Sequence, residues 1–287
     1  MRTSNTAKLI ASVVLGSALA LSAGAARAGH NGSPALIRSA IAADSVDAIQ
    51  AELEHAEYLV CAACVDMVLP LVDHADYRVR KVAAWWLARR ATGRTVYVSM
   101  LNRLSQPDSV KAANAADVLG EFKNAQAVPA LSAALGNPTF DAAARAAMAR
   151  ALGSIGRPAA SGALVTALSA PEPAVKSAAL SALRALGTFQ DATAAEPLLS
   201  DADAGVRAQA AMTFGAVRAT ASSSVAALLR VLASDASADV RKKAAWSLGE
   251  MGAPAAQAAE GLQQAAASDG SPVVRSLAEV AIGKLTR

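Results

Sequence analysis

The two cysteines are the residues of this chain best suited to covalent chemistry. Cys61 and Cys64 are the only cysteines in the sequence, and a spacing of three along a helix brings two sulfurs close enough for a local disulfide. A structural disulfide or two packed thiols is one interpretation. A redox-active pair is the alternative, although the surrounding sequence lacks the strand and helix context such pairs usually have. Val65 occupies the place where a c-type haem attachment motif requires His.

The other residues that could do chemistry are few. The chain has three histidines, His30, His55 and His74. Together with the cysteines, the last two have the right ligand types for a metal, but their spacing matches no familiar site. No Ser/His/Asp grouping, glycine-rich phosphate loop or paired-carboxylate motif stands out. We therefore expect no catalytic residue, no metal and no cofactor, and the sequence favours a protein that is not an enzyme.

A repeat pattern organises most of the chain. A hydrophobic residue is followed by Arg or Lys, then by a pair of small residues and often by Gly. The basic residues of the pattern lie 31 or 34 residues apart and are Arg80, Lys111, Arg145, Lys176, Arg207, Arg241 and Arg275. Such a period is typical of stacked units that share one continuous core. Hydrophobic residues make up 54% of the sequence and aromatic residues only 3%, so much of the apolar content is alanine, the best helix former. The sequence predicts an all-α fold, an α-solenoid of about seven stacked helical hairpins.

The N-terminus carries a secretion signal. Arg2 and Lys8 precede an apolar run over residues 9–25, and the small residues Ala26 and Ala28 flank Arg27 as in a signal peptidase site. We predict a signal peptide over residues 1–28, cleaved after Ala28, and a periplasmic or secreted protein. A membrane anchor is the alternative, but Gly and Ser interrupt the run. Cleavage would leave 24 basic and 23 acidic residues, so a nucleic-acid partner is not expected.

The mature chain divides into unequal parts. We expect residues 29–33 to be a mobile N-terminus, residues 34–72 to form irregular helical repeats, and residues 73–287 to form the regular solenoid. Within the irregular part, the helical spacing of apolar residues predicts one helix with a buried stripe. That stripe comprises Val60, Cys64, Met67, Val68 and Leu71.

The regular part carries a family resemblance. The segment Asp235-x4-Val240-Arg241-x2-Ala244-Ala245-x2-Leu248-Gly249 resembles the HEAT repeat of the short, phycobilin-lyase-like kind. The resemblance implies that the recurrent Arg joins successive repeats through Asp residues in the turns, and that the helix bearing it lines a concave binding surface. Lys111 and Lys176 replace the Arg, and an ammonium group cannot reproduce its two-pronged fork. Gly120 also sits one place late in the second unit.

Enzymes of related fold make specific demands on the sequence. Deoxyhypusine hydroxylase needs several His-Glu pairs for its iron centre, and no histidine of this chain is followed by Glu. No local motif indicates a tetrapyrrole pocket of the phycobilin lyase type, so that likeness concerns the fold alone.

One position of the repeat helix should face outward, opposite the core positions. Its occupants are Trp85, Asp117, Arg150, Ser181, Met212, Trp246 and Val280. Trp85 and Trp246 are candidate anchors for a partner, because Trp is enriched among binding hot spots. The alternative is that each ring packs on a neighbouring repeat. Trp86, one position further on, is expected in the core.

Basic residues flank both candidate anchors and could attract an acidic protein segment. The full set of candidate partner-binding residues is Trp85, Trp246, Lys81, Arg89, Arg150 and Lys242, with Arg90 and Lys243 nearby. A solvated helix face is the alternative interpretation of these charges.

Three functions remain open. The first is an exported, non-catalytic protein-binding scaffold or assembly factor that uses the concave surface to hold another exported protein. The second is an accessory factor or enzyme of redox or cofactor maturation that acts through Cys61 and Cys64. The third is a structural spacer. After signal cleavage, none of them requires a membrane span.

Overall fold

The computed structural model describes residues 32–187, 189 and 192–286. The expected signal peptide, residues 1–28, lies outside the described residues. Within the described part every regular element is a helix, which confirms the all-α solenoid. Ser33 caps the first helix, α1 (Pro34–Ala42), and the Gly32 amide donates a hydrogen bond to the His55 carbonyl at 3.1 Å.

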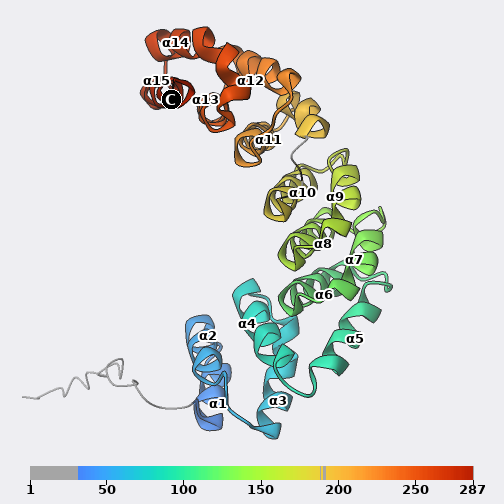
Figure 1. The fold of residues 1–287 in the computed structure, drawn as a ribbon. Coiled ribbons are helices and arrows are strands. Elements are labelled where there is room, and N and C mark those ends of the chain that lie inside the picture. Colours follow the sequence, from blue (N-terminus) through green and yellow to red (C-terminus); the bar gives the residue numbers. More distant parts are fainter. Residues whose placement is uncertain (1–31, 188, 190–191, 287) are drawn as a thin grey trace, which may run out of the picture.

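The helices form two layers of an open arc (Figure 1). The inner layer consists of α2 (Val46–His55), α4 (Tyr77–Ala88), α6 (Ser109–Phe122), α8 (Ala142–Ile155), α10 (Pro173–Leu186), α11 (Ala204–Ala216), α13 (Ala238–Met251) and α15 (Pro272–Leu285). The outer layer includes α5 (Gly93–Arg103), α7 (Val128–Leu135), α9 (Ser161–Ala167), α12 (Ser222–Ser234) and α14 (Ala259–Ser268). All seven basic residues of the repeat pattern lie on inner helices, α4 to α15.

Shorter elements complete the stack. Helix α3 (Ala62–Val68) packs with α1 at the N-terminal end and continues directly into a 3-10 helix, η1 (Leu69–Asp73). Further 3-10 segments are η2 (Ala125–Ala127), η3 (Pro158–Ala160), η4 (Ala192–Ser200) and η5 (Ala253–Ala258). Segment η4 takes the place of an outer helix between α10 and α11, and Pro197 within it disfavours a regular α-helix.

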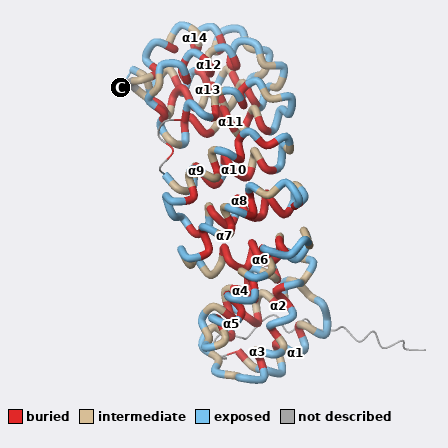
Figure 2. The backbone as a smooth tube through the Cα atoms, turned by 90° about the vertical axis from the view of Figure 1, so that its right-hand side faces the viewer, coloured by how far each residue is buried: buried red, intermediate tan, exposed pale blue. Residues whose placement is uncertain are grey.

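Small residues let the inner helices approach one another closely. A Cβ atom added at Gly215 would lie 2.6 Å from the Cα of Ser247, and one at Gly249 would lie 2.9 Å from the Cα of Ala281. Leu and Val fill the wider spaces between the layers, and the buried residues run through the stack without a break (Figure 2). The inner helices are closely spaced and the packing between the layers is bulkier, so the stack bends towards the inner layer. The need for small residues between the inner helices accounts for the alanine-rich composition.

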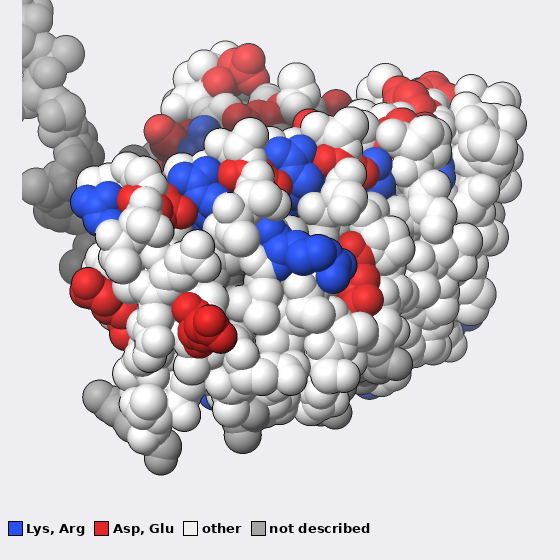
Figure 3. Space-filling view, turned by 90° about the horizontal axis from the view of Figure 1, so that it is seen from above, with Lys and Arg blue, Asp and Glu red and all other residues white. Residues whose placement is uncertain are grey.

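Arg and Asp connect the C-terminal repeats as the family resemblance implies. Arg207 donates from Nε and Nη2 to the two carboxylate oxygens of Asp235, at 2.7 and 3.1 Å. Arg241 holds Asp269 in the same way, at 2.8 and 2.9 Å. A third nitrogen, Nη1, donates to a carbonyl of the arginine's own turn, Asp201 for Arg207, at 2.8 Å. Figure 3 shows basic and acidic side chains alternating along a line on the molecular surface.

These contacts shift the pKa of the aspartates. The hydrogen bond from Arg241 holds the pKa of Asp269 below its usual value, against the opposing effect of burial. Burial alone would raise the pKa of Asp235, but hydrogen bonds from Arg207 and from the Ser237 amide lower it. Each carboxylate is therefore stabilised in its charged form by the repeat before it and by its own turn.

The connection changes towards the N-terminus, where one expectation was wrong. Asp117 was expected to face outward, from the one-residue shift around Gly120, but it is buried and accepts hydrogen bonds from Arg80 of the preceding unit at 2.7 and 3.2 Å. Lys111 pairs with Asp108 of its own turn, at 3.4 Å. The shift explains the short reach of Lys111, because it puts Ala112 where the other units have their basic residue. Lys176 does reach the next turn and pairs with Asp201.

The irregular N-terminal part also differs from expectation. Val60 was assigned to a buried stripe, but its side chain is 99% exposed. The helix begins later, at Ala62, because Cys61 caps it with a sulfur that accepts a hydrogen bond from the Cys64 amide at 3.1 Å. Cys64, Val68 and Leu71 are buried as predicted, and Met67 is half-buried.

Candidate functional site

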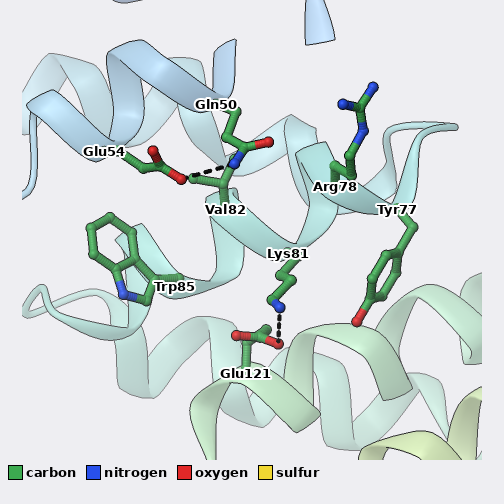
Figure 4. A pocket seen from close by; sticks show the side chains of 8 residues that line it. All are labelled: Gln50, Glu54, Tyr77, Arg78, Lys81, Val82, Trp85 and Glu121. Atoms are coloured by element: carbon green, nitrogen blue, oxygen red, sulfur yellow. Dashed lines mark hydrogen bonds and ion pairs between the residues drawn. The ribbon is translucent and has the colours of Figure 1, made fainter. Parts of the chain in front are cut away.

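A pocket of about 530 Å³ lies among three inner helices and includes one of the candidate anchors. We call it the α2–α4 pocket. Its lining residues are Gln50 and Glu54 of α2, Tyr77, Arg78, Lys81, Val82 and Trp85 of α4, and Glu121 of α6 (Figure 4). Because α2, α4 and α6 belong to the inner layer, the pocket is part of the inner side of the arc (Figure 1).

Trp85 forms the aromatic wall of the pocket and is half-buried. The guanidinium of Arg89 lies 4.3 Å from the centre of its ring, and Arg89 Nη1 donates to the Trp85 carbonyl at 2.9 Å. The cation covers part of the indole and holds its orientation. Trp86 is fully buried, as expected, and its Nε1 donates to the Ala56 carbonyl at 3.0 Å.

The polar wall of the pocket carries both signs of charge. Gln50 donates to Glu54 at 2.9 Å, and the ammonium of Lys81 lies 3.8 Å from a carboxylate oxygen of Glu121. Burial raises the pKa of Glu121, and Lys81 only partly counteracts this effect. Burial also raises the pKa of Tyr77. The pocket therefore offers an aromatic surface beside donors and acceptors that are weakly engaged with one another.

The remaining candidate residues are not brought together. Trp246 is half-buried on α13, far along the arc from Trp85 on α4 (Figure 1). Arg150 is exposed on α8, 3.7 Å from Asp117, and Lys242 lies 2.6 Å from Asp239 of its own helix. Each of the basic candidates thus has an acidic neighbour within the chain, so these residues form no concentrated basic patch.

Sequence reasoning found Trp85 and Lys81 but missed the rest of the pocket. Gln50, Glu54 and Tyr77 lie outside the repeat pattern or at its edge. Glu121 could have been found from the sequence. It lies one helical turn after Asp117 and therefore shares the helix face that was expected to point outward.

The cysteine pair forms a second site, at the N-terminal end of the molecule. Cys61 and Cys64 are joined in a disulfide at the start of α3, whereas a position within a helix was assumed from the sequence. Cys61 is half-buried and Cys64 fully buried. This disulfide closes a loop of about four residues and so removes little entropy from the unfolded chain. The resulting stabilisation of the folded state is only about 2 kcal/mol.

An open groove of about 730 Å³ runs beside the disulfide, and we call it the Cys61 groove. Its lining residues are Glu57, Tyr58, Leu59, Val60, Cys61, Ala62, Val65, Arg89, Arg90, Ala91 and Thr92. Tyr58 is 86% exposed and Val60 almost completely so, which is unusual for large apolar side chains. Tyr58, Leu59 and Val60 were the available sequence signal, but of these only Val60 was given a place, in a buried helix.

Arg90 shapes one side of the groove. Its Nη2 donates to the carbonyls of Ala56 and Glu57 at 2.9 and 3.0 Å, and its guanidinium lies against the ring of Trp86. Burial lowers the pKa of Arg90 to about 10, and the nearby Arg89 contributes in the same direction. The side chain still carries its charge at neutral pH, and it fixes the loop that leads to Cys61.

Among residues 32–187, 189 and 192–286, no three His, Cys, Asp or Glu side chains are grouped so as to hold a metal ion. The same residues include no helix with the length and hydropathy needed to cross a bilayer.

Comparison with known families decides the identity of the fold. A family model described as HEAT repeats matches residues 98–184, 139–199 and 192–283, which together exceed half of the chain. The chain is a HEAT-repeat protein. No curated protein matches its sequence.

Solved structures share this HEAT-repeat architecture at low sequence identity. The Escherichia coli protein YibA is 17% identical, with 84% of this chain and 87% of that chain covered and a TM-score of 0.57. An engineered protein is 21% identical, with 83% and 71% covered and a TM-score of 0.52. The complex of CpcE and CpcF of phycocyanin lyase from Nostoc sp. PCC7120 gives 22% identity, 77% and 94% coverage, and a TM-score of 0.42, too low to support an inference. These likenesses concern the fold alone.

Proposed function

We propose that this HEAT-repeat protein is an exported binding scaffold or assembly factor, and that its inner surface holds a segment of another exported protein without catalysing a reaction. The observation that carries the proposal is the α2–α4 pocket, which places a half-buried Trp85 on the inner side of a rigid arc. A preorganised surface of this kind binds with little ordering cost. Trp246 supplies a second aromatic contact further along the same layer.

The lining of the pocket defines the partner segment. An apolar or aromatic side chain fits against Trp85 and Val82, because both offer apolar surface to the pocket. An acidic residue next to it would reach Lys81 and Arg78, whose present carboxylate neighbours lie at 3.8 and 2.9 Å. The pair of Arg78 and Asp47 is exposed and such pairs contribute little, so a partner carboxylate can replace Asp47 at small cost. The proposed ligand is therefore an acidic segment with an apolar anchor.

Site-specific photocross-linking tests the use of the inner surface. A photoreactive amino acid is placed at Gln50, at the pocket, or at Ser181, which is exposed on inner helix α10. The matched control is Val98, which is exposed on outer helix α5. In the producing cell, we expect the same partner to be cross-linked from the two inner positions and not from Val98. Equal cross-linking from Val98 would refute the proposal.

The anchor role of Trp85 is tested in the same assay. Trp85→Ala should lower the yield of cross-linked partner from Gln50 by up to about thirtyfold, which corresponds to the loss of about 2 kcal/mol at a binding hot spot. Trp246→Ala is the matched variant at the same repeat position on α13, and we expect a smaller loss. Helicity and melting temperature of both variants should remain close to those of the parent protein. A lower melting temperature with unchanged cross-linking would show that Trp85 serves packing only.

Export is part of the proposal and has its own test. Mass spectrometry of the protein isolated from its natural source should show a mature chain that begins at Gly29 and is found outside the cytoplasm. A chain that retains its N-terminal Met and stays in the cytoplasm would contradict this part of the proposal. The binding surface would then need a cytoplasmic partner.

A further inference from the structure

The two sulfurs of the disulfide differ in their accessibility. Cys61 lines the open groove and is half-buried, whereas Cys64 does not line it and is fully buried. Thiol–disulfide exchange begins with the attack of a thiolate on one sulfur of the bond. A thiolate that enters the groove meets the sulfur of Cys61 first. The fold therefore determines which cysteine would form a mixed disulfide.

The groove has the chemistry needed to hold a polypeptide that carries a thiol. Tyr58 and Val60 present apolar side chains to solvent directly before Cys61, and they can cover apolar residues of a partner. Arg89 and Arg90 line the same groove together with Glu57, which pairs with Arg89 at 3.3 Å, so the three side chains give the groove a net positive charge. Because the attacking group is an anion, these charges favour its presence beside Cys61.

The surrounding structure also stabilises the thiolate of Cys61, which the second step of the exchange releases. The Cys64 amide donates to the sulfur of Cys61 at 3.1 Å, and this bond is stronger when the sulfur is charged. Arg90 holds the carbonyls of the loop before Cys61 and so keeps the groove in place. Arg90 is thus a positioning residue for the pair.

We propose that Cys61 and Cys64 form a redox-active disulfide that oxidises a dithiol of a partner polypeptide bound in the Cys61 groove. One partner thiol loses its proton and attacks Cys61 as a thiolate, the bond between Cys61 and Cys64 breaks, and Cys64 leaves as a thiolate and takes up the proton that the partner thiol lost. The second partner thiolate then attacks the partner sulfur of the mixed disulfide and releases Cys61. The partner loses two electrons and gains a disulfide, and the cysteine pair gains the two electrons and becomes a dithiol. This activity is separate from binding in the α2–α4 pocket.

The first experiment compares the two cysteines in the full mature chain. The variant Cys64→Ser keeps only the Cys61 thiol, and Cys61→Ser keeps only the Cys64 thiol. At pH 7 the Cys61 thiol should react with the aromatic disulfide 5,5′-dithiobis(2-nitrobenzoate) at least about tenfold faster than the Cys64 thiol. Equal rates, or a faster Cys64, would overturn the proposal.

The parent protein provides a readout that does not depend on folding of the variants. In glutathione buffers that leave structural disulfides intact, alkylation and mass spectrometry should show the pair becoming reduced. Helicity should persist on reduction, because the inner and outer helices do not depend on this bond. A pair that stays oxidised in these buffers would show that the disulfide is structural.

The second experiment tests the groove with a defined probe, a synthetic peptide dithiol flanked by leucines. The double variant Tyr58→Ser, Val60→Ser should oxidise this peptide about fivefold more slowly, because two apolar contacts are lost. Its reaction with glutathione, which is too small to need the groove, should be unchanged. Val110→Ser removes another exposed valine, on α6, and is the matched control for both reactions. Unchanged peptide oxidation in the double variant, or equal slowing with glutathione, would contradict docking in the groove.

Discussion

Neighbouring repeats are connected differently at the two ends of the solenoid. From α11 to α15, an arginine of each repeat donates two hydrogen bonds to an aspartate in the turn of the next repeat, and we call this pair of bonds an arginine fork. The distances are nearly the same each time. From α2 to α6, Arg80 crosses to an aspartate within a helix, and Arg90 holds loop carbonyls. The C-terminal end, α11 to α15, follows the sequence pattern of the repeat, and the N-terminal end, α2 to α6, departs from it. We call them the regular end and the irregular end.

The difference between the two ends shows which side chains are used to connect repeats and which line a pocket or groove. In the regular stack, the signature residues Arg207, Asp235, Arg241 and Asp269 are used by one another and by the turns. In the irregular end, charged and aromatic side chains line the α2–α4 pocket and the Cys61 groove, although several of them, Arg78, Arg89 and Arg90 among them, also have partners within the chain. Regular repeats build the scaffold, and departures from the repeat supply the sites.

The largest expected effect comes from breaking one arginine fork. Asp235→Ala removes the partner of Arg207 and leaves a largely buried guanidinium without its carboxylate, so we expect a loss of about 3 kcal/mol in the free energy of unfolding. Asp108→Ala is the matched change in the irregular end, where the aspartate only caps its own helix and pairs with Lys111. Its loss should be about 1 kcal/mol.

The tryptophans report the two ends separately in urea unfolding. Trp246 lies in the regular stack, and Trp85 and Trp86 lie in the irregular end. In the variant Asp235→Ala, the transition seen by Trp246 should shift to lower urea more than the one seen by Trp85 and Trp86. Losses of equal size for Asp235→Ala and Asp108→Ala would mean that the fork is no stronger than a helix cap.

The close contact between inner helices gives the next largest effect. Gly215→Ala would place a Cβ 2.6 Å from the backbone of Ser247, and relief of this overlap should cost about 2 kcal/mol. Gly283 occupies the same repeat position on α15, but a Cβ there meets nothing within 4 Å. Gly283→Ala should therefore leave stability unchanged or raise it by up to about 1 kcal/mol, through helix propensity alone. A similar loss in both variants would show that the contact is not what requires glycine.

Most of the fold could be predicted because the same local pattern occurs many times. Seven basic residues at nearly constant spacing mark the inner helices, and small residues at fixed places mark their contacts. Errors occurred where one unit is out of register. Asp117 was expected outside because its exposure was inferred from its place on the helix, whereas its burial depends on Arg80 of the preceding unit.

The candidate sites were less predictable for a physical reason. The α2–α4 pocket is formed by residues of three helices, and one of them, α2, comes from a part of the chain without a clear repeat. Periodicity identifies which face of a helix is apolar, but it does not give the distance between neighbouring helices. The start of α3 at Ala62 depends on a cap by a cysteine sulfur, which common capping preferences do not include.

Acid should weaken the two ends unequally. The pKa values of Asp201, Asp235 and Asp269 are lowered in the folded chain, so the stability they provide is present above about pH 4 and is lost as pH falls through the lowered values. In the irregular end, backbone amides of their own helix starts lower the pKa values of Asp76 and Asp108, but burial raises the pKa of Glu121, whose protonation therefore favours the folded state as pH falls.

We expect the unfolding midpoint reported by Trp246 to fall more steeply between pH 5 and 3, taken as about the range of carboxylate titration, than that reported by Trp85 and Trp86. In the double variant Asp235→Ala, Asp269→Ala, most of this difference should disappear. Parallel pH profiles at the two ends of the parent protein would contradict the assignment of the pKa shifts to the forks.

The smallest expected effect concerns Lys111 and Lys176, the two lysines that stand at the basic position of the repeat pattern. Lys176 is largely buried and reaches Asp201 of the next turn, whereas Lys111 is exposed and pairs only with Asp108 of its own turn. Lys111→Ala should therefore change the free energy of unfolding by no more than about 0.5 kcal/mol, the range for exposed ion pairs. Lys176→Ala leaves the carboxylate of Asp201 without its cation and should cost several times more. If the two losses were equal, Lys111 would also join repeats, and the one-residue shift in α6 would not account for the change of connection at the N-terminal end.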